Sequence, residues 1–158
     1  MAGRFAIRRL GLIVAAVIFA ADLLSKPILL DLMAANPGGI RVTPFFNLVM
    51  VWNRGVSFGL LSGDAPMRVL LLVALALGII VWLGFWLWRT PYRFTAAALG
   101  LVIGGAFGNI VDRLRFGAVA DFFDFHFAGW HWPAFNIADS SIVIGVALLV
   151  LDSLRAKV

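Results

Sequence analysis

Four long apolar segments, separated by stretches richer in polar residues, dominate the pattern along the chain. Each contains about 20 residues, roughly the helical length that crosses the hydrocarbon core of a bilayer. We therefore predict four transmembrane helices, at about 10–28, 67–88, 94–112 and 137–155. The connection "RTPYR" between the second and third segments is very short, so these two helices are expected to be antiparallel neighbours.

The stretch between the first two apolar segments has a different pattern. Residues 47–53 alternate with period two, with Asn or Val at the odd positions and Leu, Met or Trp at the even ones, which is typical of a strand. Gly55 and Gly59 follow and permit turns. The prediction is an integral membrane protein of mainly α class, one membrane-embedded domain over 1–158. It carries a small extracytoplasmic β element in the first outer loop, 29–66.

Composition supports the membrane assignment. Hydrophobic residues make up 63% of the chain, and the mean hydropathy is +1.01, whereas soluble domains are roughly 45–50% apolar. The net charge of +5 does not indicate nucleic-acid binding, because the basic residues are scattered between apolar runs. The absence of cysteine excludes a thiol nucleophile and thiolate metal sites. Asp22 interrupts the first apolar segment and no A-x-A site follows it, which disfavours a cleavable signal peptide.

The loop charges predict the orientation. Seven basic residues and one aspartate fall on the side of the two termini, against six basic residues and seven aspartates on the other side. By the positive-inside rule both termini are expected in the cytoplasm, and the outer loops, 29–66 and 113–136, on the periplasmic side. Trp130 and Trp132 fit an aromatic belt at the outer boundary.

Polar residues gather at this outer level. "GNIVDR" closes the third apolar segment and "FNIADS" opens the fourth. Each contains N-x-x-D, Asn109 with Asp112 and Asn136 with Asp139, and the i, i+3 spacing places each pair on one helical face. Asp22 and Lys26 reach the same level from the first segment. Ionisable residues in membrane segments suggest a functional site.

Structural interpretations of these residues remain open at this point. Asn136 can serve as a helix N-cap with Asp139 as a favourable first-turn charge. Asp112 with the adjacent Arg113, and Asp22 with Lys26, can be structural ion pairs. His126 and His131 have no further ligand at metal spacing and no G-x-S-x-G motif is present, so neither a metal or other cofactor nor serine catalysis is predicted.

The remaining chemistry is that of paired aspartates. Two close carboxyl groups share a proton, so that the ionised one can activate water while the protonated one donates to a scissile carbonyl. The candidates are Asp112, Asp121 and Asp139. Spacing alone favours Asp112 with Asp139, because of the twin N-x-x-D motifs.

Taken together, five motifs in order around four spans resemble the lipoprotein signal peptidase family, also called signal peptidase II, over nearly the whole chain. They are D-x-x-S-K at Asp22, Ser25 and Lys26; N-x-G-x-S-F-G from Asn53 to Gly59; G-N-x-x-D-R from Gly108 to Arg113; V-A-D-F-F-D-F from Val119 to Phe125; and F-N-x-A-D-S from Phe135 to Ser140. Ala120 stands where a second valine is usual in the family, which is a conservative difference.

The resemblance implies an aspartic endopeptidase of the bacterial inner membrane. Such an enzyme removes the signal peptide from diacylglyceryl-modified prolipoproteins and cuts just before the lipidated cysteine. Its partners would be those lipidated signal peptides and membrane lipids, without nucleic acid, and one chain would hold every catalytic part, as expected of a functional monomer. The catalytic pair falls on Asp121 and Asp139. The supporting or substrate-binding residues are Asp22, Lys26, Asn53, Gly55, Asn109, Asp112, Arg113, Asn136 and Ala138.

A physical argument favours Asp121 over Asp112 as the partner of Asp139. Asp121 lies among apolar residues, where desolvation raises a carboxyl pKa toward the range of a general acid. Asp112 has Arg113 and Asn109 as expected partners, which would keep it ionised. The small Ala138 is expected to leave room for the substrate chain. The alternative function is a small proton-coupled transporter, which would place carboxylates near the bilayer midplane.

Overall fold

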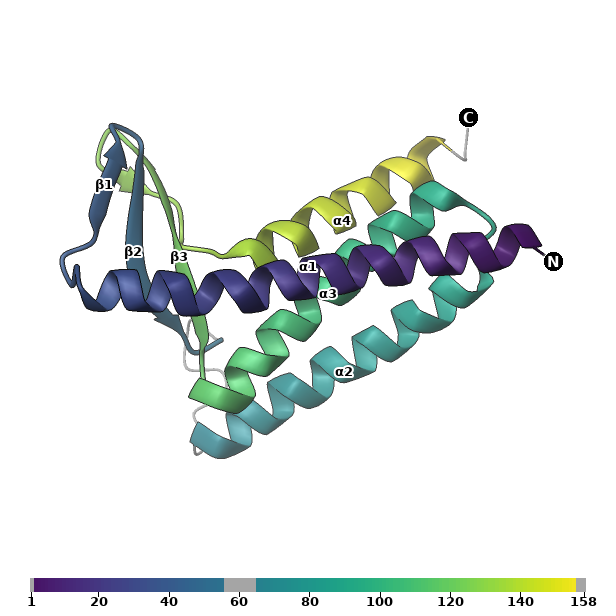
Figure 1. The fold of residues 1–158 in the computed structure, drawn as a ribbon, viewed down its shortest axis with the longest axis horizontal. Coiled ribbons are helices and arrows are strands. Elements are labelled where there is room, and N and C mark those ends of the chain that lie inside the picture. The colour runs from purple at the N-terminus through teal and green to yellow at the C-terminus, as the bar shows by residue number, and fades with distance from the viewer. Residues whose placement is uncertain (1, 56–64, 156–158) are drawn as a thin grey trace.

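The computed structural model describes residues 2–55 and 65–155 and contains four helices long and apolar enough to cross a membrane. They are α1 (Ala2–Ala34), α2 (Ala65–Arg89), α3 (Arg93–Phe116) and α4 (Ile137–Arg155). Figure 1 shows that α1 begins and α4 ends at the same end of the bundle, opposite a small sheet. The predicted mainly α membrane fold is therefore confirmed.

Helix α1 is much longer than the apolar segment that predicted it. Its 33 residues, at about 1.5 Å each, span about 50 Å, compared with ~30 Å for the hydrocarbon core. The final turns, which lie beyond the predicted apolar segment, have another surface to pack on. Met33, with Leu29 and Leu30 beside it, packs against Phe122 of the sheet.

The sheet is antiparallel, with strands in the order β1 (Ile40–Thr43), β2 (Phe46–Asn53), β3 (Val119–Phe127) and β4 (Trp130–His131). Strand β2 confirms the strand predicted from the period-two pattern, and β1 also comes from the first outer loop. Strands β3 and β4 come from the second outer loop, for which no strand was expected. The reason is that β3 is buried on both faces at its start, so its sequence does not alternate there.

The strands cross the end of the helix bundle rather than extending along its axis (Figure 1). Gly55, which follows β2, has a φ of 91° in the left-handed region, so a residue without a Cβ is needed at this predicted turn. Gly59, the other predicted turn residue, lies outside the described residues.

Helix α3 contacts the other three helices and forms the centre of the bundle. Two glycines of α3 lie against α1: a Cβ on Gly100 would collide with the carbonyl oxygen of Gly11, and one on Gly104 with that of Ala15. On the opposite side, Gly105 contacts the carbonyl of Ala138 in α4. The two helices that flank α3 therefore approach its backbone at van der Waals distance, as small residues permit in membrane bundles.

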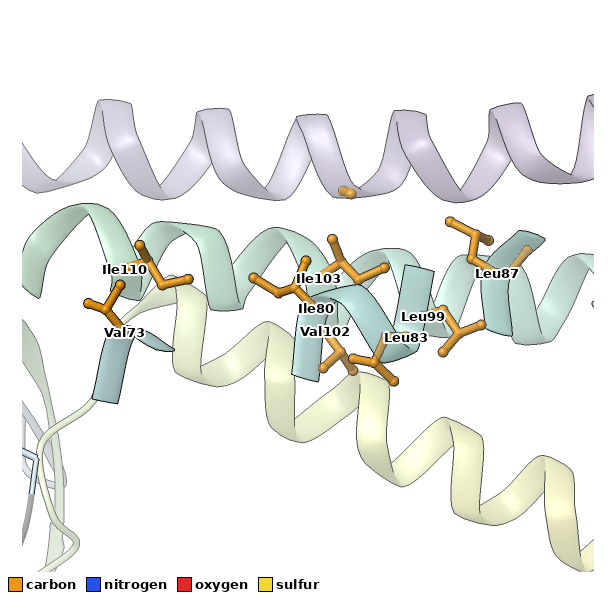
Figure 2. Close-up of a cluster of buried hydrophobic side chains, with 10 residues drawn as sticks. Val73, Ile80, Leu83, Leu87, Leu99, Val102, Ile103 and Ile110 are labelled. Carbon is orange, nitrogen blue, oxygen red and sulfur yellow. The ribbon is translucent and has the colours of Figure 1, made fainter. Parts of the chain in front are cut away.

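The main apolar core lies mostly between α2 and α3 (Figure 2). Val73 and Ile80 of α2 lie in the same cluster as Ile103 and Ile110 of α3. The outward faces of the helices are also apolar, with Leu75 and other large side chains exposed. This is the surface that a bilayer covers, because lipid rather than water is the solvent there.

Candidate active site

Asn136 joins the first turn of α4 to strand β3. Its Oδ1 accepts a hydrogen bond from the backbone N–H of Asp139 at 2.8 Å, as expected of a helix N-cap. Its Nδ2 donates to Oδ1 of Asp121 at 2.7 Å and to the carbonyl of Ala120 at 3.2 Å. One buried amide thus holds the segments that carry two of the three candidate aspartates.

Asn109 of α3 is the second amide in this group. Its Nδ2 donates to Oδ1 of Asp139 at 2.8 Å, and its Oδ1 accepts from Asn136 at 3.4 Å. Asp139 also lies in the first turn of α4, where the helix dipole favours a negative charge. The hydrogen bond from Asn109 thus orients the Asp139 carboxyl.

Asp121 has the opposite environment. Only 1% of its surface is exposed, and burial raises its pKa to about 7, with the neighbouring charge of Asp139 adding to the rise. Hydrogen bonding from Asn53 and Asn136 opposes the increase. The structure therefore places a carboxyl whose pKa is raised to about 7 beside a second carboxyl that accepts a hydrogen bond from Asn109.

Asp112 points away from this pair and is buried next to Lys26. Its Oδ2 lies 2.7 Å from Nζ of Lys26 and accepts the N–H of Ala120 at 3.1 Å. Neither Arg113 nor Asn109 supplies the hydrogen bonds expected for Asp112, since Arg113 donates instead to the carbonyl of Asn109 at 3.3 Å. Consecutive helical residues point in different directions, so adjacency in sequence does not produce a pair.

Lys26 bridges two carboxylates. Besides Asp112, it lies 2.6 Å from Oδ2 of Asp22, which confirms the predicted i, i+4 ion pair. Oδ1 of Asp22 accepts the N–H of Ala138 at 3.1 Å. Ala120 and Ala138 immediately precede Asp121 and Asp139 in the sequence. Each of these alanines therefore donates its backbone N–H to one of the two carboxylates that share Lys26.

The other predicted residues surround the pair. Arg113 lies within electrostatic reach of both Asp139 and Asp121. A Cβ on Gly55 would lie 3.8 Å from Nη2 of Arg113, and the N–H of Gly55 donates to Oδ1 of Asn53 at 2.9 Å. All these side chains converge at the sheet end of the bundle.

Two alanines next to the aspartates contribute through their backbone. Ala138 is fully buried, and its carbonyl lies where a Cβ on Gly105 of α3 would be, so the missing side chain of Gly105 permits the close crossing of α3 and α4. That the small Ala138 leaves room for the substrate chain stays a prediction. Ala120 was not predicted as a site residue, yet both its N–H and its carbonyl bind site side chains. Backbone groups leave no compositional signal, so only its position next to Asp121 could have indicated this role.

The two histidines lie at the far end of β3. Their rings stack with centroids 4.9 Å apart, and Nδ1 of His131 is 2.8 Å from Asp124. Within residues 2–55 and 65–155, no group of three or more His, Asp or similar ligands is arranged to hold a metal ion.

Comparison with known proteins agrees with the geometry. Residues 14–155 match the family model described as signal peptidase (SPase) II. The lipoprotein signal peptidase of Methylorubrum extorquens (strain PA1) is 45% identical over 150 residues, which cover 93% of this chain and 86% of that protein. The lipoprotein signal peptidase of Nitrobacter hamburgensis (strain DSM 10229 / NCIMB 13809 / X14) is 43% identical, with 92% of each chain covered.

Solved structures show the same fold. A bacterial membrane enzyme structure at 1.9 Å resolution superposes with a TM-score of 0.79 and 30% sequence identity, covering 92% of both chains. A second bacterial membrane enzyme structure, at 2.3 Å, gives a TM-score of 0.77 and 29% identity over 93% of this chain and 88% of the other.

Proposed function

The chain belongs to the signal peptidase II family, and from this premise we propose that it is an aspartic endopeptidase for diacylglyceryl-modified prolipoproteins. It removes the signal peptide by cutting just before the lipidated cysteine. The observation that carries the aspartic mechanism is the asymmetric pair: Asp121, with a pKa raised to about 7, lies beside Asp139, whose carboxyl accepts a hydrogen bond from Asn109.

In the proposed mechanism Asp139 is the general base and Asp121 the general acid. Asp139 takes a proton from a water molecule, whose oxygen attacks the scissile carbonyl carbon while protonated Asp121 donates to the carbonyl oxygen. The resulting tetrahedral intermediate collapses as the cysteine nitrogen is protonated by Asp139 and leaves. Asp121 regains its proton from the intermediate's hydroxyl, so the pair returns to its starting state. Arg113 and Asn109 orient Asp139 in these steps.

The position of the pair supports this substrate. Asp121 and Asp139 lie where α3 ends and α4 begins, next to the sheet. The cleavage site of a signal peptide lies at the outer end of its apolar span, so enzyme and scissile bond meet at the same depth. We place this end of the bundle on the periplasmic side of the bacterial inner membrane and both termini in the cytoplasm.

One chain is sufficient for the proposed chemistry, because Asp22, Lys26, Asn53, Gly55 and the catalytic pair all come from one molecule. The expected partners remain lipidated signal peptides and membrane lipids, with no nucleic acid. A proton-coupled transporter is the less favoured function, because its carboxylates would lie near the bilayer midplane, whereas the candidate carboxylates meet at the sheet end of the bundle.

The test is cleavage of a diacylglyceryl-modified prolipoprotein by purified protein in lipid, with product masses defining the cut. Asp121→Asn and Asp139→Asn should fold and lose activity. Asp31→Asn, at an exposed position on α1, is the matched control and should cleave normally. Wild-type protein that fails to cut would refute the peptidase function, and normal cleavage by Asp121→Asn would refute the aspartic pair.

A further inference from the structure

The hairpin formed by β3 and β4 has two chemically different faces. Side chains alternate along a strand, so Phe125 and Phe127 point to one face and Asp124 and His126 to the other. Residues opposite each other in an antiparallel pair share a face. Trp130 therefore joins Phe127, since the two are register partners.

The same register extends each face. His131 pairs with His126 on the polar face. Trp132, whose N–H donates to the carbonyl of Phe125, lies on the aromatic face. Phe45 lies alongside, because the N–H of His126 donates to its carbonyl. We call Phe45, Phe125, Phe127, Trp130 and Trp132 the aromatic tip.

The aromatic tip is as exposed as the apolar residues on the outward faces of the helices. Phe127 is 80% exposed, Trp130 61% and Trp132 56%. Its side chains, with Phe135 and His126, line a hollow of about 420 Å³. Leaving so many aromatic rings in water is unfavourable, at roughly 25 cal/mol per Å² of apolar surface. Contiguous apolar patches of this kind mark interaction surfaces.

The chain connections fix the depth of the tip relative to the bilayer. Only Gly117 and Ala118 separate α3 from β3, and residues 132–136 alone connect β4 to α4. The hairpin is thus tied at both ends to the level where two membrane helices end. Figure 1 shows the strands crossing the bundle end, so the hairpin extends sideways over that end rather than continuing along the helix axes.

The orientation of the faces matches an interface between lipid and water. The aromatic side chains of β3 lie at odd positions, as does Asp121, which accepts a hydrogen bond from Asn136 at the start of α4. This face is therefore turned toward the start of α4, whereas Phe122 on the other face packs against Met33 of α1. On the polar face, Asp124 accepts from Asn47 at 2.9 Å and lies 2.8 Å from His131. Although burial opposes ionisation, these two contacts hold the pKa of Asp124 below its ordinary value.

We propose that the aromatic tip is a membrane anchor that inserts between the headgroups and acyl chains of the leaflet beside the outer end of α4. Its partner is phospholipid. Tryptophan and phenylalanine suit this zone, since Trp in particular presents an apolar body and a polar N–H. The anchor fixes the height of the sheet over the bilayer, and this inference does not depend on the proposed peptidase activity.

The experiment compares two neighbouring positions on opposite faces. All tryptophans except Trp130 are replaced by Phe, and the full chain is reconstituted in phosphatidylcholine vesicles with bromine on the acyl chains. The matched control is His131→Trp in a protein with no other tryptophan. We expect bromolipid to quench Trp130 at least threefold more strongly than the tryptophan at position 131, and acrylamide to show the reverse order.

Two results would overturn the proposal. If acrylamide quenches both positions equally and bromolipid neither, the tip lies in water. If Trp130 is shielded from both quenchers, protein such as a second copy of the chain covers it.

A second measurement avoids the tryptophan replacements. The chain has no cysteine, so Phe127→Cys and His131→Cys each accept one nitroxide label. We expect the label at position 127, but not the label at position 131, to be more accessible to oxygen than to a nickel chelate. The same accessibility at the two positions would contradict insertion.

Discussion

Replacement of Lys26 by methionine removes the cation that two buried carboxylates share. In the wild type, Nζ of Lys26 lies 2.6 Å from Asp22 and 2.7 Å from Asp112, and Lys26 is only 4% exposed. Methionine has a similar length and no charge, so the packing is nearly kept. Removing one partner of a buried ion pair typically destabilises a protein by about 3–5 kcal/mol. Here two partners lose their counter-charge, so we expect a loss near the upper end, about 5 kcal/mol.

The assay is equilibrium unfolding in mixed micelles, followed by circular dichroism and activity. A triple variant, Lys26→Met with Asp22→Asn and Asp112→Asn, removes all three charges together and should recover most of the lost stability. Arg41→Met, which removes an exposed cation from β1, is the matched control and should change stability by less than about 0.5 kcal/mol.

The position of the proposed catalytic pair should respond separately from stability. Asp22 and Asp112 hold the N–H groups of Ala138 and Ala120, next to Asp139 and Asp121. Folded Lys26→Met protein should therefore show a lower kcat at little change in KM, because the carboxyls that do the chemistry are displaced. A Lys26→Met protein within 1 kcal/mol of wild type, or a triple variant no more stable than the single one, would refute the bridging role.

Three further outcomes are expected. The pKa of Asp121 is raised to about 7, so the wild type should lose stability relative to Asp121→Asn between about pH 4 and 7, with no further loss above pH 7. Unfolding at a series of pH values measures this, and a pH-independent difference in stability would contradict it. Cleavage should decline above pH 7 as Asp121 loses its proton. Asn136→Ala removes a hydrogen bond that lowers the pKa of Asp121, so it should move this decline to higher pH while reducing kcat. An unchanged pH profile would argue against the contact between Asn136 and Asp121. Gly104→Ala places a Cβ against the carbonyl of Ala15 and should destabilise the protein by roughly 1–3 kcal/mol. In the control variant Gly78→Ala the new Cβ meets open space, so its stability should be unchanged or slightly higher in the same assay. Equal effects of the two substitutions would disprove the close contact.

The sequence predicted the helices and β2 well because each follows one strong period. It did not predict β3, whose first residues are buried on both faces and read as an apolar run. It also placed α1 too short, because the turns around Met33 pack on the sheet rather than in lipid, and hydropathy alone carries no signal for such packing.

The candidate site shows the same division between local and distant information. The Asp22–Lys26 pair and the capping role of Asn136 are local, and spacing predicted both. The second partner of Lys26, Asp112, is supplied by another helix and cannot be read from spacing. Spacing also favoured Asp112 as the partner of Asp139, whereas resemblance suggested Asp121. The environment that distinguishes the two carboxyls exists only after β3 has folded against α4.

The hydrogen bond from the N–H of Ala138 to Asp22 joins residues 116 positions apart. Asp22 of the first helix can therefore accept this bond only after the last helix has been synthesised. A truncated or half-inserted chain holds Asp121 but cannot hold Asp139 in place beside it. The last helix to be made therefore supplies both the partner of this bond and Asp139, so the carboxyl pair is assembled only when α4 packs on α1 and α3.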